Sequence, residues 1–275
     1  MDTTNIYNIT DKMIKISLYF THKHIESALE LKDKNVVVID VLRTSTTMIL
    51  GLTNGAKEII PTEDVATAGL IGRNSQGHSL LCGERNGKLI EGFNLGNSIK
   101  EYSAERVNGK TLIFSSTNGT PALMKAKFAH NCVIVGFTNI SRVVEYLTNL
   151  NEDFIILCAG RSVEFSLEDT ACAGMLINLL TKKNSKQKYV LTDSAVASTK
   201  IYSNYKKSLV KLMQDSEHGK YLIQIGFSDD LEECAKVDTC NCLPILRNGV
   251  IKLIESFESD PKLTMKKVVG NSINS

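Results

Sequence analysis

The sequence NVVVIDVLRTSTT, residues 35–47, decides the fold of this chain. Val36–Ile39 are four consecutive β-branched apolar residues, which predicts a strand buried on both faces. Asp40 follows where that strand ends, and Arg43 and four hydroxyl residues then open a helix. Ligands bind at this edge of an open α/β sheet, where a carboxylate can hold a hard cation and a helix start can bind an anion. The stretch therefore predicts metal-assisted chemistry on a phosphate.

Composition excludes several other classes of protein. The chain has 275 residues, of which 43% are hydrophobic and 23% charged, as in an ordinary globular domain. The net charge of +2 is too small to give the strongly positive surface of a nucleic-acid-binding protein. No apolar run approaches the roughly 18 residues of a membrane span, and the N-terminus lacks the apolar core of a signal peptide. Seven cysteines, an odd number, predict reduced thiols and a cytoplasmic protein.

Strand-like and helix-like segments alternate from Ile14 onward, which predicts an α/β fold with α/β/α layers and a mixed, largely parallel sheet. Residues 1–12 are polar, and we expect them to form a flexible tail. Residues 13–275 are expected to form one domain, and a division of it into two lobes near Gly136–Asn139 is left open. Expected strands are Lys15–Tyr19, Val36–Ile39, Leu112–Ser115, Val133–Val135, Phe154–Leu157 and Lys188–Leu191. Expected helices are Thr44–Leu52, Glu63–Ile71, Pro121–Ala129, Ile140–Leu150, Leu167–Leu180, Ser194–Tyr205 and Ser228–Ala235.

Three acidic residues are candidates for metal binding. Asp40 ends the central strand, although a helix N-cap is the plainer interpretation. Glu168 and Asp169 open a helix that follows the strand and turn Phe154–Gly160. Equally, Asp169 can be a residue of a capping box and Glu168 a favourable charge on the helix dipole. The three together favour Mg²⁺, which in proteins usually needs one or two carboxylates beside water and substrate oxygens.

Other segments fit a phosphate or another anion. Ser115–Thr120 contains several hydroxyl residues and a glycine, and it follows an apolar strand. This pattern fits either an anion-binding loop or a plain Asn-Gly turn. The glycine-rich residues 83–98 suggest a loop over a ligand or an ordinary surface loop, in which Arg85 can bind an anion bidentately. His218, in Ser216–Gly219, is a weak catalytic candidate by itself.

In this order, the segments resemble the family of 2-phosphosulfolactate phosphatases, the ComB-type enzymes, over most of the chain from Ile16 to about Val250. The Thr-Asn-Gly-Thr and Leu-Glu-Asp blocks are the most specific of the matches. Asn94 and Ile99 depart from the pattern, where an acidic residue and a proline are expected. The matching stretches are Asp40–Thr47, Gly83–Arg85, Gly92-Phe93 with Gly96–Ser98, Ser116–Thr120, Cys158–Gly160, Phe165–Asp169 and Ser216–Gly219.

The resemblance implies a Mg²⁺-dependent phosphatase that converts 2-phospho-3-sulfolactate to 3-sulfolactate and phosphate in coenzyme M biosynthesis. On this hypothesis Asp40 with Glu168 or Asp169 holds the metal, Arg43 and the helix start bind the phosphoryl group, and His218 protonates the leaving oxygen. Arg85, Asn118 and Gly119 contact the sulfonate or the carboxylate. Water attack and phosphorylation of Asp40 both remain open. The predicted catalytic residues are Asp40, Arg43, Glu168 and His218. The predicted substrate-binding residues are Arg43, Thr44, Ser45, Thr46, Arg85, Asn97, Thr117, Asn118, Gly119 and Thr120.

Two other functions stay open at this point. One is a phosphatase of the same scaffold for another small phosphorylated carboxylic acid, and the other is a non-catalytic binder of anionic metabolites. The expected partner is a small phosphorylated sulfonate, with no nucleic acid and no membrane, while a homo-oligomer is left open.

Overall fold

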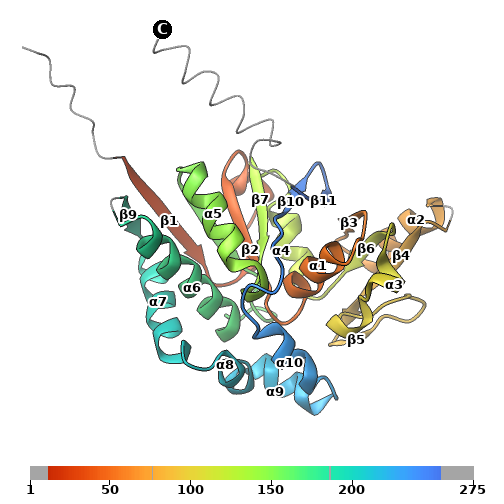
Figure 1. Cartoon of the computed structure of the whole chain (residues 1–275). Helices are drawn as coiled ribbons and strands as arrows, with labels where there is room; N and C mark the ends of the chain where they lie inside the picture. Colours follow the sequence, from red (N-terminus) through yellow and green to blue (C-terminus); the bar gives the residue numbers. More distant parts are fainter. Residues whose placement is uncertain (1–11, 76, 186, 255–275) are drawn as a thin grey trace, which may run out of the picture.

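Figure 1 shows the computed structural model, which describes residues 12–254 apart from residues 76 and 186. Of the predicted tail, residues 1–12, all but Lys12 lie outside the described residues, as do residues 255–275 of the predicted domain. None of the described helices is long and apolar enough to cross a membrane.

The described strands form a single eleven-stranded sheet in the order β5-β4-β6-β3-β11-β10-β7-β2-β8-β1-β9. All six predicted strands are confirmed, and β3, β4, β5, β10 and β11 are additional to them. The strands are β1 (Met13–Tyr19), β2 (Asn35–Ile39), β3 (Glu58–Pro61), β4 (Ser79–Arg85), β5 (Lys88–Leu89), β6 (Thr111–Ser115), β7 (Asn131–Val135), β8 (Phe154–Cys158), β9 (Lys188–Leu191), β10 (Pro244–Arg247) and β11 (Val250–Leu253).

All seven predicted helices are present, with ends that shift by a few residues. The helix predicted over Glu63–Ile71 begins later because the Asp64 carboxylate accepts a hydrogen bond from Thr67 N and caps it. Helices α3, α8 and α9 were not predicted. The α-helices are α1 (Thr44–Thr53), α2 (Val65–Asn74), α3 (Ala104–Val107), α4 (Gly119–Lys125), α5 (Ile140–Leu150), α6 (Leu167–Lys183), α7 (Asp193–Tyr205), α8 (Leu209–Asp215), α9 (Glu217–Gln224) and α10 (Ser228–Cys234).

Apart from the edge strand β5, which pairs antiparallel with β4, the sheet consists of two parallel blocks joined by an antiparallel hairpin. Strands β7, β2, β8, β1 and β9 form one block, and β3, β6 and β4 form the other. The C-terminal hairpin β10–β11 lies between them, antiparallel to β7 on one side and to β3 on the other. The two blocks therefore run in opposite local directions, yet the segments that follow β2 and β6 are in contact. Thr44 after β2 hydrogen-bonds Ser116 after β6, with 3.1 Å between the hydroxyl oxygens.

Two hydrophobic cores cover the two faces of the sheet and give the three predicted layers. On β2, Val37 and Ile39 belong to one core and Val36 and Val38 to the other, which confirms a strand buried on both faces. Helices α5 and α6 pack in the first core, and α1 and α4 in the second. Helices α8, α9 and α10 gather into one group at an end of the molecule (Figure 1). This group supplies His218 to the site.

Candidate active site

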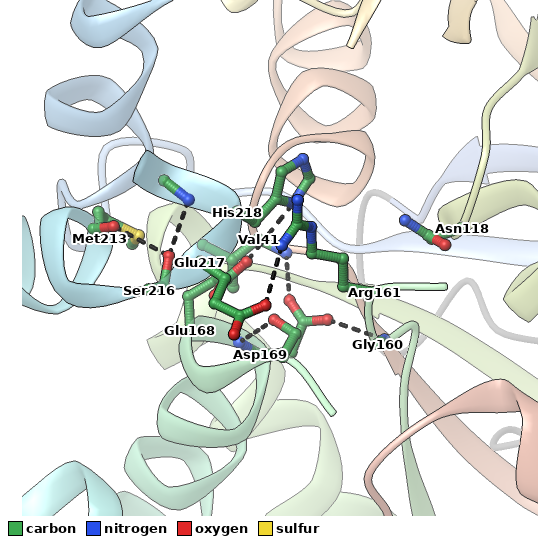
Figure 2. Close-up of polar contacts among 12 residues, drawn as sticks. Val41, Asn118, Gly160, Arg161, Glu168, Asp169, Met213, Ser216, Glu217 and His218 are labelled. Carbon is green, nitrogen blue, oxygen red and sulfur yellow. Dashed lines mark hydrogen bonds and ion pairs between the residues drawn. The ribbon is translucent and has the colours of Figure 1, made fainter. Parts of the chain in front are cut away.

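Asp169 ties together the ends of two neighbouring strands. Its Oδ1 accepts a hydrogen bond from Val41 N after β2 (2.8 Å), and its Oδ2 accepts one from Gly160 N after β8 (3.2 Å), as Figure 2 shows. Ser166 Oγ accepts from Asp169 N, so half of the predicted capping box forms, while the carboxylate reaches the strand ends instead. Burial, and then the charges of Glu168 and Asp40, raise the pKa of Asp169 well above its ordinary value.

Glu168 lies beside it in the first turn of α6, and its side chain is also buried. Its Oε1 is 3.6 Å from Nδ1 of His218, at the start of α9, whereas its buried Oε2 has no hydrogen-bond partner among the residues that the structure describes. Burial would raise the pKa of Glu168, but the hydrogen bond and charge of His218 outweigh it and lower this pKa. Glu168 therefore offers one ionised oxygen that no described residue satisfies.

Asp40 is the third buried carboxylate, 6% exposed. Burial raises its pKa to about 6, the hydroxyl of Thr44 and the charge of His218 oppose the shift, and the charges of Glu84 and Glu168 add to it. The backbone at Gly119 approaches this carboxylate so closely that a Cβ there would lie 2.3 Å from Asp40 Oδ2. Only glycine fits at this point of the α4 start.

The hydroxyls after Asp40 divide into two groups. Ser45 Oγ accepts from Asp40 N (2.9 Å) and Thr46 Oγ1 donates to Val41 O (2.9 Å), so these two side chains build the turn. Thr44 Oγ1 instead lies between Ser116 Oγ and Asn97 Nδ2, which is 3.4 Å away. Within the described ranges, the buried Oδ1 of Asn97 has no hydrogen-bond partner. Thr44 and Asn97 are thus the better placed of the predicted substrate-binding residues.

The guanidinium of Arg43 is hydrogen-bonded to groups of the protein itself. Its Nη1 donates to Asp230 Oδ2 and its Nη2 to Gly87 O, both at 2.7 Å, and its guanidinium lies 4.3 Å from the ring centroid of Phe227. Arg43 and Asp230 are almost fully buried. Arg43 also lines the small cavity described below, and its predicted role toward phosphate remains a prediction.

Glu84 belongs to the matching stretch Gly83–Arg85, and no role was predicted for it. In the structure it connects two loops of the site. Its carboxylate accepts from Gly87 N and Thr117 N, each at 2.7 Å, and from Thr117 Oγ1 at 3.1 Å. The guanidinium of Arg85 donates hydrogen bonds to Glu84 O and Ser115 Oγ. Thr120 Oγ1 accepts from Ser116 N, which closes the turn before α4. The predicted residues Arg85, Thr117 and Thr120 therefore make contacts that shape these loops.

Two cavities meet at His218. A small one of about 10 Å³, near the minimum for one water molecule, is lined among others by Asp40, Thr44, Glu84 and Asn118. A larger one of about 480 Å³, within the range of small-molecule pockets, is lined among others by Glu168 and Arg161. Because His218 lines both, it stands where the buried carboxylates face the larger space.

Asp40 and Glu168 fit a divalent cation. Both are buried, Glu168 Oε2 has no hydrogen-bond partner among the described residues, and the pKa of Asp40 is raised first by burial and then by the charges of Glu84 and Glu168. Among the described residues no group of three or more His, Cys, Asp or Glu side chains is arranged to hold a metal ion, and both Asp169 oxygens already accept from backbone amides. Two carboxylates suffice for Mg²⁺ when water and substrate supply the other oxygens.

A family model described as 2-phosphosulpholactate phosphatase matches residues 19–249. The chain belongs to the 2-phosphosulpholactate phosphatase family. It is 37% identical over 243 residues to a probable 2-phosphosulfolactate phosphatase of Caldanaerobacter subterraneus subsp. tengcongensis, covering 88% of this chain and 99% of the relative. It is 38% identical over 222 residues to the protein of the same description from Thermotoga maritima, covering 81% of this chain and 93% of the relative.

In this member of the 2-phosphosulpholactate phosphatase family, the loop that departs from the expected pattern is held by its own side chains. Asn94 Oδ1 accepts from Leu81 N (2.8 Å), and Ile99 begins the short 3-10 helix η3 (Ile99–Glu101). The loop thereby brings Asn97 to Thr44.

Proposed function

We propose that this protein is a Mg²⁺-dependent phosphatase that hydrolyses 2-phospho-3-sulfolactate to 3-sulfolactate and phosphate. Family membership and the names of the relatives support the substrate and the reaction. The observation that carries the metal dependence is the pair of buried carboxylates, Asp40 and Glu168, of which Glu168 has an oxygen that no group in the described part of the chain satisfies.

We extend the proposal to the setting of the reaction. The activity belongs to coenzyme M biosynthesis in the cytoplasm, and its partner is the small substrate, with neither nucleic acid nor membrane. All seven cysteines are buried and free of disulfides, which suits a reducing compartment. A homo-oligomer stays open.

Asp40 and Glu168 would hold the metal, which when bound neutralises charge on the phosphoryl oxygens. Thr44 and Asn97 offer a hydroxyl and an amide beside Asp40 for the phosphoryl group. His218, oriented by Glu168, is placed to give a proton to the leaving oxygen. Asp169 fixes the relative position of the two strand ends that carry these groups.

Two routes differ in what attacks phosphorus. Either a water molecule attacks directly, or an Asp40 oxygen displaces the alcohol and the resulting aspartyl phosphate is hydrolysed. Acid quenching during turnover followed by peptide mass spectrometry decides between them. A phosphorylated peptide containing Asp40 supports the second route, and its absence at high substrate occupancy supports the first.

The proposal is tested by phosphate release from 2-phospho-3-sulfolactate with Mg²⁺ and after chelation with EDTA. Asp40→Asn and Glu168→Gln are each expected to lower kcat by about 100-fold or more, since charge stabilisation and proton transfer each contribute factors of this order. Arg73→Ala, an exposed change on α2, is the control. Near-normal turnover after EDTA treatment would contradict the metal dependence, and preference for another phosphorylated acid would contradict the substrate.

A further inference from the structure

Arg161 is fixed at the larger cavity by a tight turn. Gly160, whose φ is +71°, donates its N–H to Asp169, and Arg161 and Glu164 exchange two backbone hydrogen bonds of 3.0 and 2.9 Å. Ser162 N donates to Asn118 Oδ1 and attaches the same turn to the α4 start. The backbone of Arg161 is therefore held against the buried carboxylates, although the sequence motifs gave this residue no role.

The guanidinium of Arg161 has a partner that it can exchange. Its Nη1 lies 3.0 Å from Glu217 Oε2, and the side chains of Arg161 and Glu217 are 34% and 84% exposed. Exposed ion pairs of this kind contribute little to stability, so a ligand anion can replace the glutamate. Figure 2 shows Arg161 reaching from its turn toward His218 and Glu217.

The larger cavity has few groups that can attract an anion. Among the described residues that line it, Arg161 and His218 alone carry or can carry a positive charge, while Glu164, Glu168, Asp215 and Glu217 are acidic. Arg43 and Arg85, the other arginines of the site, are bound by groups inside the protein. An anion entering this cavity therefore meets Arg161.

We propose that Arg161 binds the sulfonate of the substrate and releases Glu217 when it does so. The inference rests on the proposed function and adds a specificity residue to it. The reacting ester belongs beside buried Glu168 and His218, and the sulfonate lies one bond farther from the ester-bearing carbon than the carboxylate does. The more distant acid group thus falls toward the open side, where the guanidinium fork can bind two of its oxygens.

The test compares 2-phospho-3-sulfolactate with 2-phospholactate, which has the carboxylate but no sulfonate. Arg161→Ala is expected to lower the ratio of the two kcat/KM values by about 10- to 100-fold, the range for hydrogen bonds to a charged group. Arg161→Lys should recover part of this preference through charge alone. Arg73→Ala is the matched control for loss of an arginine. A ratio that stays within about twofold of the wild-type value in Arg161→Ala would overturn the inference.

Glu217→Gln tests the exchange itself. With its competitor neutral, Arg161 should bind the sulfonate more readily, and KM for 2-phospho-3-sulfolactate is expected to fall by up to about fivefold, as befits a weak exposed pair. A rise in KM would overturn the exchange.

Calorimetry with 3-sulfolactate separates this inference from the proposed function. If the wild-type protein hydrolyses neither compound but binds 3-sulfolactate in a way that Arg161→Ala abolishes, the function fails and the sulfonate site stands. If hydrolysis proceeds and Arg161→Ala leaves the preference for 2-phospho-3-sulfolactate over 2-phospholactate unchanged, the proposed function stands and the proposed sulfonate site is wrong. Neither hydrolysis nor binding would reject both.

Discussion

At the scale of single residues, Asp40 is a buried carboxylate whose negative charge its surroundings compensate only in part. Its folded-state pKa of about 6 exceeds the ordinary value of 3.8, so between pH 4 and 6 the folded protein holds a proton that the unfolded chain has lost. The stability that this proton contributes is therefore present at low pH and lost as the pH rises through about 6.

Asp40→Asn should consequently stabilise the metal-free protein while it abolishes activity. The expected gain at neutral pH is up to about 3 kcal/mol, because each pKa unit corresponds to about 1.4 kcal/mol. Thermal unfolding in EDTA at pH 7.5 and at pH 4 measures it, and the gain should shrink at pH 4. Addition of Mg²⁺ should raise Tm for the wild type but not for the variant. An equal rise in both would remove Asp40 from the metal site.

Gly119→Ala should be harmful although the change is small. The added Cβ would lie 2.3 Å from Asp40 Oδ2 and 2.5 Å from Thr44 Cβ, so the site must shift. We expect a loss of about 1–3 kcal/mol in the free energy of unfolding, and a larger proportional loss of kcat. The control is Gly69→Ala on α2, where nothing lies within 4 Å and the helix should gain up to about 1 kcal/mol. Chemical denaturation and phosphate release measure the two effects.

The sequence indicated which residue types form the site better than what each of them contacts. Asp40, Glu168 and Asp169 do converge, because strand ends of a parallel block share one edge of the sheet. Arg43, in contrast, pairs with Asp230, 187 residues away, and no local pattern contains that partner. Glu84 was visible in its motif, but its bonds to Gly87 and Thr117 depend on how two loops fold.

At the scale of elements, α10 is fastened to the start of α1 by one buried ion pair. Asp230 accepts from Arg43 at 2.7 Å and from Ser98 Oγ at 2.8 Å. Helix α10 packs on α9, so the same pair helps to hold the helix that carries His218.

Removal of one partner would leave a buried charge alone. Asp230→Ala is expected to lower the free energy of unfolding by about 3–5 kcal/mol. Asp229→Ala, the neighbouring change, breaks an exposed pair with Lys100 and should alter stability by about 1 kcal/mol or less. Urea denaturation of the two variants measures the difference. Equal effects would show that the buried pair is not what fastens α10.

The missed elements have physical explanations. Strand β4 is half-exposed over its first three residues and β3 alternates over four residues, so neither forms a continuous apolar run. The hairpin β10–β11 could have been found, because Asn248-Gly249 between two short apolar segments is a strong signal for a two-residue turn. Helices α8 and α9 are short and owe their starts to Ser208 and Ser216, whose hydroxyls accept backbone N–H groups.

At the scale of the whole molecule, the hairpin β10–β11 connects the two parallel blocks. Ile251 in β11 is fully buried and pairs in register with Ile59 of β3. Lys252, the next residue, faces outward and forms a pair with Glu58.

Ile251→Ala should therefore weaken the contact between the blocks. We expect a loss of about 2–5 kcal/mol, against about 1 kcal/mol or less for Lys252→Ala. Calorimetry should show one transition for the wild type and for Lys252→Ala. If Ile251→Ala were no less stable than Lys252→Ala, the hairpin would not be what joins the sheet.

The central place of this hairpin also bears on biosynthesis. Strands β10 and β11 leave the ribosome after every other strand described here, yet they fill the middle of the sheet. Until they emerge, β7 and β3 each expose an unpaired edge of the kind that invites pairing with another chain. Contacts so distant along the polypeptide form slowly. The nascent protein is thus most vulnerable to aggregation until this hairpin has emerged, and a chaperone that shields strand edges would help it most during that interval.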